Sequence, residues 1–142
     1  MEVREFLLRP SRLQKKINSL NLLKATYEEL ADSTPGVNYD KPFSQSNRSL
    51  QAPFVKWIDK IMQVEKKIEE AEAELAKAKA DVVAAIEKIP NQDYQNLLVL
   101  RYLNGCTWDD ICSSLYISKP TGYRWHLDAL DKIEVPNEDE SS

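Results

Sequence analysis

An apolar heptad repeat in the middle of the chain restricts its possible folds more than any other feature. Apolar residues recur every seven positions at Phe54, Ile61, Ile68, Leu75, Val82 and Ile89. A second set follows three places after each of the first five, at Trp57, Val64, Ala71, Ala78 and Ala85. This spacing is typical of a helix that buries one stripe against a partner helix. It predicts a helix from about Ala52 to Ile89, roughly 55 Å long.

The N-terminal segment supplies one candidate partner. After Ser11, a helical stripe is formed by Leu13, Ile17, Leu20, Leu23, Tyr27 and Leu30. Turn-forming residues at 32–36 predict its end. A helix of about 22 residues reaches roughly 33 Å and would cover only part of the longer helix. We therefore expect Leu75, Val82 and Ile86 to need cover from the C-terminal helices or from a second chain, and we predict a homo-oligomer formed through the coiled coil.

The segment that joins the two helices, residues 33–51, is rich in Pro, Ser, Asn and Gln. Its length exceeds that of an ordinary hairpin connection, so we predict a mobile loop. A partner-binding loop and a poorly ordered connector both fit this composition.

The last third of the chain predicts three short helices joined by tight turns. Helical spacing stops at Asn104 and Gly105, a pair that tolerates the left-handed conformation at a helix end. Thr107 is a suitable N-cap for the second helix. Ser118 is an N-cap for the third, and Pro120 is tolerated in its first turn. This arrangement predicts a helix-turn-helix domain over residues 91–134.

The third helix has a predicted core face and a predicted DNA-binding face. The core is expected to contain Trp108, Ile111, Leu115, Ile117, Trp125, Ala129, Leu130 and Ile133. The aromatic residues also fit a base-stacking platform, but their helical spacing in so small a domain favours the core. The predicted DNA-binding residues are Lys119, Pro120, Thr121, Tyr123 and Arg124. They occupy the first turns of the helix, where a recognition helix presents side chains to bases and phosphates.

The segment LRYLNGCTWDDICSSLYIS, followed by DALDKI, resembles region 4 of bacterial sigma factors. The whole layout is similar to small phage proteins of the ArpU and RinA type, and to a related streptococcal phage family of unknown function. The resemblance implies a sigma-like helix-turn-helix behind a helical N-terminal half, and a regulator of late phage genes. Gly122 stands where region 4 usually has an aliphatic residue, so we expect a looser helix or a closer helix contact there.

Composition and motifs argue against several other classes of protein. The chain is 42% apolar and 30% charged with three glycines, which indicates a helix-rich protein of one or two small domains. It has no apolar run near the ~20 residues that span a bilayer, and its start does not resemble a signal peptide. We therefore predict a cytoplasmic protein without membrane contact, whose two cysteines, Cys106 and Cys112, are reduced.

No catalytic, cofactor or metal site is predicted. His126 is the only histidine, and the two cysteines lack the spacing of a zinc site. The chain contains no phosphate loop, dinucleotide fingerprint or hydrolase motif. We expect His126 to lie at the surface or in helix packing, and we predict a protein that is not an enzyme.

Charge is the strongest test of the DNA-binding hypothesis. Residues 91–134 carry four basic and six acidic side chains, a net charge of −2, whereas most DNA-binding modules are basic. The first 24 residues are richer in basic side chains, namely Arg4, Arg9, Arg12, Lys15, Lys16 and Lys24. This basic segment is a candidate source of the missing phosphate contacts. The acidic tail, residues 135–142, is predicted to be disordered.

Together these features predict an all-α protein in which residues 1–90 form a helical hairpin or coiled coil and residues 91–134 form the helix-turn-helix. The predicted function is that of a phage or prophage transcription regulator that binds double-stranded DNA. An alternative is an interaction adaptor that contacts RNA polymerase or another regulator and binds little DNA itself. A purely structural coiled-coil protein is a third possibility.

Overall fold

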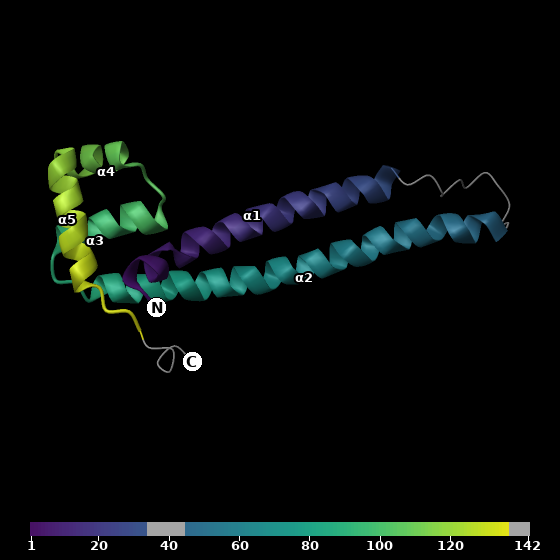
Figure 1. Cartoon of the computed structure of the whole chain (residues 1–142), viewed down its shortest axis with the longest axis horizontal. Helices are drawn as coiled ribbons and strands as arrows, with labels where there is room; N and C mark the ends of the chain where they lie inside the picture. Colours follow the sequence, from purple (N-terminus) through teal and green to yellow (C-terminus); the bar gives the residue numbers. More distant parts are fainter. Residues whose placement is uncertain (34–44, 137–142) are drawn as a thin grey trace. The chain divides into compact units, whose positions relative to one another are not determined.

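In the part that the computed structural model describes, the protein has helices joined by short turns and no strands. That part is residues 1–33 and 45–136, with side chains described for residues 1–33 and 53–136. The elements are α1 (Val3–Ser33), α2 (Gln45–Glu87), α3 (Gln92–Leu98), a π-helical turn η1 (Val99–Leu103), α4 (Trp108–Leu115) and α5 (Lys119–Lys132) (Figure 1). The predicted all-α class is confirmed. In the described ranges no helix is long and apolar enough to cross a membrane.

The chain divides into two compact units. The first contains Met1–Gln14 and Ala73–Ser142, and the second contains Lys15–Glu72. The boundary predicted at residue 90 therefore falls inside the first unit. Of the loop predicted over residues 33–51, residues 34–44 lie outside the described part and residues 45–51 already belong to α2. Of the predicted tail, residues 137–142 lie outside the described part as well.

Helix α1 begins earlier than the sequence pattern predicted. The stripe after Ser11 placed its start near that residue, but α1 starts at Val3 and runs for 31 residues with Pro10 inside it. Proline normally interrupts a helix because it lacks an N–H group. Here Phe6 and Leu7, on the N-terminal side of Pro10, are 5% and 0% exposed. Burial of these two side chains favours the extra turns.

The core of the first unit combines residues from every helical element of that unit. Its buried members are Phe6, Leu7, Val82, Ala85, Ile86, Ile89, Leu97, Leu98, Tyr102, Ile111, Ala129, Leu130 and Ile133. Val82 and Ile86 are 0% and 2% exposed, and Leu75 is 8% exposed. Of the two expected sources of cover, the C-terminal helices therefore serve for Val82 and Ile86, which share their core. Phe6 and Leu7 of α1, which lie outside the predicted N-terminal helix, share the core with Val82 and Ile86. Oligomer formation stays a prediction, but an uncovered stripe on the heptad helix no longer supports it.

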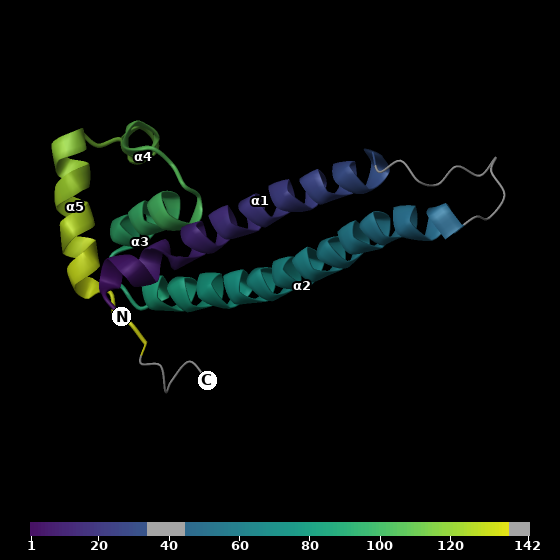
Figure 2. The same cartoon turned by 45° about the vertical axis from the view of Figure 1, so that its right-hand side comes forward.

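The second unit consists of parts of α1 and α2 that run side by side in opposite directions (Figures 1 and 2). Val64, Ile68 and Ala71 of the heptad repeat are buried, as is Ile17 of α1. The rings of Tyr27 and Trp57 lie 5.7 Å apart. Lys24 forms an ion pair with Glu65 at 3.4 Å between Nζ and Oε1. The N-terminal segment is thus a partner of the heptad helix within this unit, as predicted.

Helices α4 and α5 begin directly after Thr107 and Ser118, the two N-caps that the sequence predicted. The Thr107 Oγ1 accepts a hydrogen bond from the Asp110 N–H at 3.2 Å, which caps α4. Gly105 has φ +66°, the left-handed conformation expected after the preceding helix. Helix α4 ends at Tyr116, and the sequence did not predict the positive φ of 56° at that residue. Helix α5 packs against both α3 and α4, so these short helices have a common core.

Candidate nucleic-acid interface

The first turn of α5 is held by its N-cap. The Ser118 Oγ accepts a hydrogen bond from the Thr121 N–H at 3.4 Å and lies 3.0 Å from the Thr121 Oγ1. Pro120 stands in the first turn, where a missing N–H costs nothing. Of the five predicted DNA-binding residues, Thr121 is half-buried and Lys119, Pro120, Tyr123 and Arg124 are exposed. The structure thus brings these side chains to the start of one helix.

Lys119 is not an isolated cation at this surface. Its Nζ lies 2.6 Å from the Asp109 Oδ1 at the start of α4. The hydrogen bond and the negative charge of Asp109 raise the pKa of Lys119. Both side chains are largely exposed, and exposed ion pairs contribute little to stability. A phosphate group can therefore compete with Asp109 for this lysine.

Arg124 is oriented by a hydrogen bond on its own helix. Its Nη2 donates to the Thr121 Oγ1 at 3.2 Å, and Thr121 is in turn bonded to the cap Ser118. Among the described residues, no carboxylate lies within ion-pair distance of Arg124. Its remaining N–H donors are thus available to an acceptor outside the chain.

Trp108 connects the start of α4 to two other elements. Its ring meets the Tyr123 ring of α5 edge-on, with centroids 5.0 Å apart and planes at 79°. The Arg101 guanidinium of η1 lies 5.1 Å from the Trp108 ring centroid. Trp108 is half-buried and packs against the core of the first unit. The prediction that it is a core residue is confirmed, while its contact with Tyr123 reaches the outer surface.

Gly122 allows α4 and α5 to approach closely. A Cβ atom at this buried position would lie 3.0 Å from the Cys112 Sγ and 3.6 Å from the Ile117 Cδ1. A side chain such as the aliphatic one usual in sigma region 4 would overpack this contact. Of the two expectations for Gly122, the structure therefore supports the closer helix contact.

A contact between Tyr102 and His126 was not predicted from the sequence. The Tyr102 hydroxyl lies 2.6 Å from the His126 Nε2, and the two rings stack with centroids 5.7 Å apart. His126 also meets the Trp108 ring at 5.1 Å. It thus has a helix-packing role, one of the two roles expected. The residues are 24 positions apart, so no local spacing could have paired them.

Burial and charge keep His126 neutral. Burial lowers the pKa of His126 most, and the positive charges of Arg4 and Arg101 lower it further. Burial also raises the pKa of Tyr102, so its hydroxyl keeps its proton. A neutral His126 can accept a hydrogen bond from that hydroxyl at Nε2. The pair is thus an uncharged hydrogen bond beside two arginines.

We expect the free energy of unfolding to fall as the pH decreases below about 6.5, the ordinary histidine pKa. In that range the unfolded chain binds a proton that the folded chain does not, because the folded pKa of His126 is lower. The loss stops once the pH falls below the folded pKa. Urea unfolding at several pH values between 7.5 and 5.5 measures this fall in the free energy of unfolding. Because His126 is the only histidine, His126→Gln should remove the slope, and an unchanged slope in that variant would contradict this prediction.

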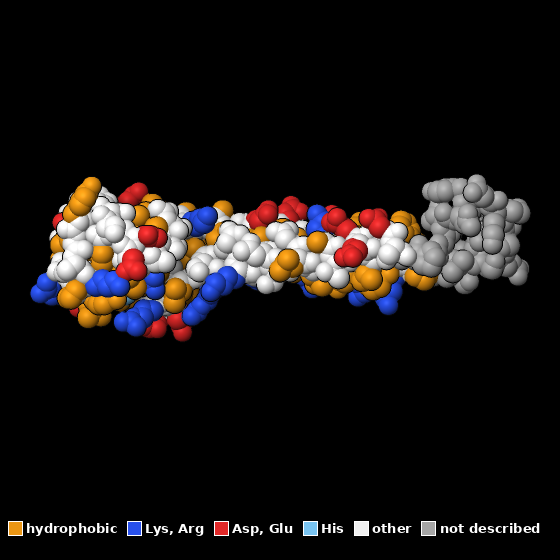
Figure 3. Space-filling view, turned by 90° about the horizontal axis from the view of Figure 1, so that it is seen from above, with side chains coloured by type: hydrophobic (Ala, Val, Ile, Leu, Met, Phe, Trp, Pro, Cys, Tyr) orange, Lys and Arg blue, Asp and Glu red, His pale blue; other side chains and the backbone are white. Residues whose placement is uncertain are grey.

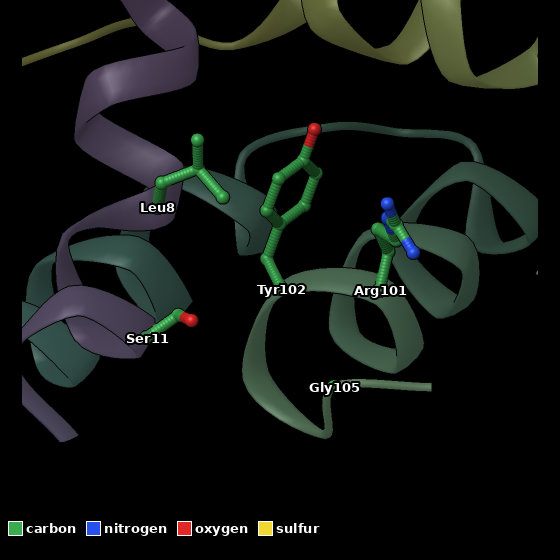
Figure 4. A pocket seen from close by; sticks show the side chains of 5 residues that line it. All are labelled: Leu8, Ser11, Arg101, Tyr102 and Gly105. Atoms are coloured by element: carbon green, nitrogen blue, oxygen red, sulfur yellow. The ribbon is translucent and has the colours of Figure 1, made fainter. Parts of the chain in front are cut away.

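A hollow of about 220 Å³ lies between α1 and η1 in the first unit, lined by Leu8, Ser11, Arg101, Tyr102 and Gly105. Figure 4 shows Leu8 and Ser11 on one side, with Tyr102 and Arg101 rising from η1. Its polar groups are one guanidinium and two hydroxyls. This combination suits an anion better than a metal ion. In the described part of the chain, no three His, Cys, Asp or Glu side chains are grouped as a metal site requires.

Comparison with known proteins places the chain in a family. Residues 56–134, more than half of the chain, match the model of DUF1492, described as a protein of unknown function. The chain belongs to the DUF1492 family. No curated protein and no solved structure matches it. The DUF1492 match includes the heptad helix from Lys56 onward and all of α3 to α5. It names neither a phage regulator nor a sigma factor, so the resemblance to those families stays a prediction.

Proposed function

We propose that this DUF1492 protein is a phage or prophage transcription regulator that binds double-stranded DNA through α4 and α5, acting as a helix-turn-helix. The observation that carries the proposal is the arrangement of these two capped helices around Gly122. They pack closely on their inner sides, while Lys119, Tyr123 and Arg124 are exposed on the first turns of α5. The N-terminal half of the second helix enters the major groove in this motif.

The three exposed side chains suit different parts of a duplex. An arginine can donate two hydrogen bonds to one guanine, and the bond to Thr121 orients Arg124 for such a contact. Tyr123, packed against Trp108, offers an apolar ring to a thymine methyl group. Lys119, at the helix start, is placed to meet a phosphate after leaving Asp109. On this proposal Arg124 contributes specificity and Lys119 contributes general affinity.

Alanine at these two positions should have different effects on binding. Arg124→Ala is expected to reduce the preference for the specific site by about 1 to 3 kcal/mol. Lys119→Ala should weaken all sequences similarly and make the salt dependence shallower by about one unit. Binding to a promoter fragment and to random duplex DNA, measured by fluorescence anisotropy at several salt concentrations, separates the two effects. Wild-type binding by both variants would contradict the proposed roles.

The adaptor alternative is favoured by a separate observation. Residues 91–134 carry a net charge of −2, and the exposed surface of this region includes Tyr116 at 94% and Leu127 at 56% exposure. Exposed apolar side chains beside acids suit a protein surface such as RNA polymerase. If Tyr116→Ala and Leu127→Ala abolished polymerase binding while the protein had no salt-dependent affinity for DNA, the adaptor function would replace DNA recognition.

A further inference from the structure

The two sides of α5 have different chemical neighbours. On one side, the Tyr94 hydroxyl of α3 donates to the Asp128 Oδ2 at 3.1 Å, and the Tyr94 ring lies near Trp125. This side presents an acid. On the other side, His126 meets Tyr102 of η1, and η1 also contributes Arg101. A polyanion that lies along α5 would therefore be attracted to the η1 side.

The start of α1 adds a second arginine, Arg4, beside the C-terminal half of α5. Arg4 lines a hollow of about 440 Å³ with Val3, Leu127 and Leu130, and with the acids Glu2 and Asp131. Leu127 belongs to the exposed surface of α5. Arg4 is exposed, and no carboxylate in the described part of the chain lies within 4 Å of its guanidinium. Figure 3 shows Lys and Arg side chains along one edge of the first unit, with apolar and acidic side chains among them.

Arg4 and Arg101 converge on the same neutral pair. The positive charge of each acts on both Tyr102 and His126, and disfavours protonation of His126. Arg101 is held in place because its guanidinium stacks over Trp108 and its Nη1 donates to the Cys106 carbonyl at 3.3 Å. Trp108 also contacts Tyr123 of α5. The position of Arg101 is thus fixed relative to the predicted recognition helix.

We propose that Arg4 of α1 and Arg101 of η1 bind the phosphate backbone of the same DNA duplex whose major groove α5 enters. This inference rests on the proposed function and adds a contact from the opposite end of the chain. Phosphate contacts account for half or more of protein–DNA hydrogen bonds, and guanidinium groups bind phosphates through paired N–H donors. The acidic C-terminal helices supply few such donors. The two arginines supply them, Arg4 beside the C-terminal half of α5 and Arg101 over Trp108 at the start of α4.

The salt dependence of binding to random-sequence duplex DNA tests this proposal, using the full chain and fluorescence anisotropy. Arg4→Gln should weaken binding about 5- to 10-fold near 0.1 M salt and make the slope of log K against log salt shallower by about 0.9. Arg101→Gln should weaken binding and reduce the salt dependence to a similar extent. Arg101→Lys, which keeps the charge, should retain most of the slope. Lys88→Gln is the matched control, because it removes an exposed charge of the same unit that lines neither hollow.

The outcomes separate this inference from the proposed function. If Lys119→Gln and Arg124→Gln weaken binding while Arg4→Gln binds like Lys88→Gln, then α5 binds DNA and the inference is wrong. If the wild-type protein shows no salt-dependent affinity for duplex DNA, both fail. The thermal unfolding midpoint of each variant shows whether the protein still folds, which matters most for Arg101→Gln. Because Arg4 is exposed, its variant is expected to melt like the wild type, and Arg4→Gln alone decides the question if Arg101→Gln unfolds.

Discussion

Leu7→Ala is expected to lower the free energy of unfolding by about 2 to 5 kcal/mol, the usual cost of truncating a fully buried leucine. Leu7 is 0% exposed and shares a core with buried residues of α2, α3, η1, α4 and α5. A change near the N-terminus should therefore destabilise the C-terminal helices. Urea unfolding followed by circular dichroism measures the free energy, and tryptophan fluorescence reports on the surroundings of Trp57, Trp108 and Trp125 together.

Leu22→Ala is the matched control for Leu7→Ala, because it makes the same change in the same helix at a side chain that is 72% exposed. Its effect should stay within about 0.5 kcal/mol, as for most surface substitutions. If both variants unfolded like the wild type, the first turns of α1 would not belong to the core of the first unit. The C-terminal helices would then fold without them.

Trp108→Ala is expected to cost about 3 to 5 kcal/mol, as a large-to-small change at a residue packed on the core. The variant loses the edge-on contacts with Tyr123 and His126 and the stacking with Arg101. The fluorescence change on unfolding and the midpoint in urea measure this loss. Trp108→Phe keeps an aromatic ring and should cost less.

Tyr116→Ala serves as the control for Trp108→Ala, because Tyr116 is an aromatic residue of the same unit that is 94% exposed. The backbone strain at its positive φ is similar for alanine. We expect its stability to remain near that of the wild type. A Trp108→Ala variant with unchanged unfolding but no DNA binding would show that Trp108 serves the interface rather than the core.

The candidate site was largely accessible from local sequence signals. Caps and turns depend on residues a few positions apart, so Thr107, Gly105 and Ser118 marked the helix boundaries that the structure has. The exposed positions of Lys119, Tyr123 and Arg124 followed from the same local spacing. Local spacing did not predict the Lys119–Asp109 ion pair or the Tyr102–His126 hydrogen bond, because each joins two separate helical segments.

The sequence by itself determined the helical class, the burial of the heptad stripe from Val64 to Ile89 and the starts of α4 and α5, because these depend on periodicity and on neighbouring residues. Only the tertiary structure decided how far α1 extends. Pro10 carries a local cost inside a helix because it lacks an N–H group, but burial of Phe6 and Leu7 against the C-terminal core outweighs that cost. For the same reason the first turns of α1 belong with helices more than 60 residues away in the sequence. Long-range burial of apolar surface is a property of the folded chain, and no local pattern encodes it.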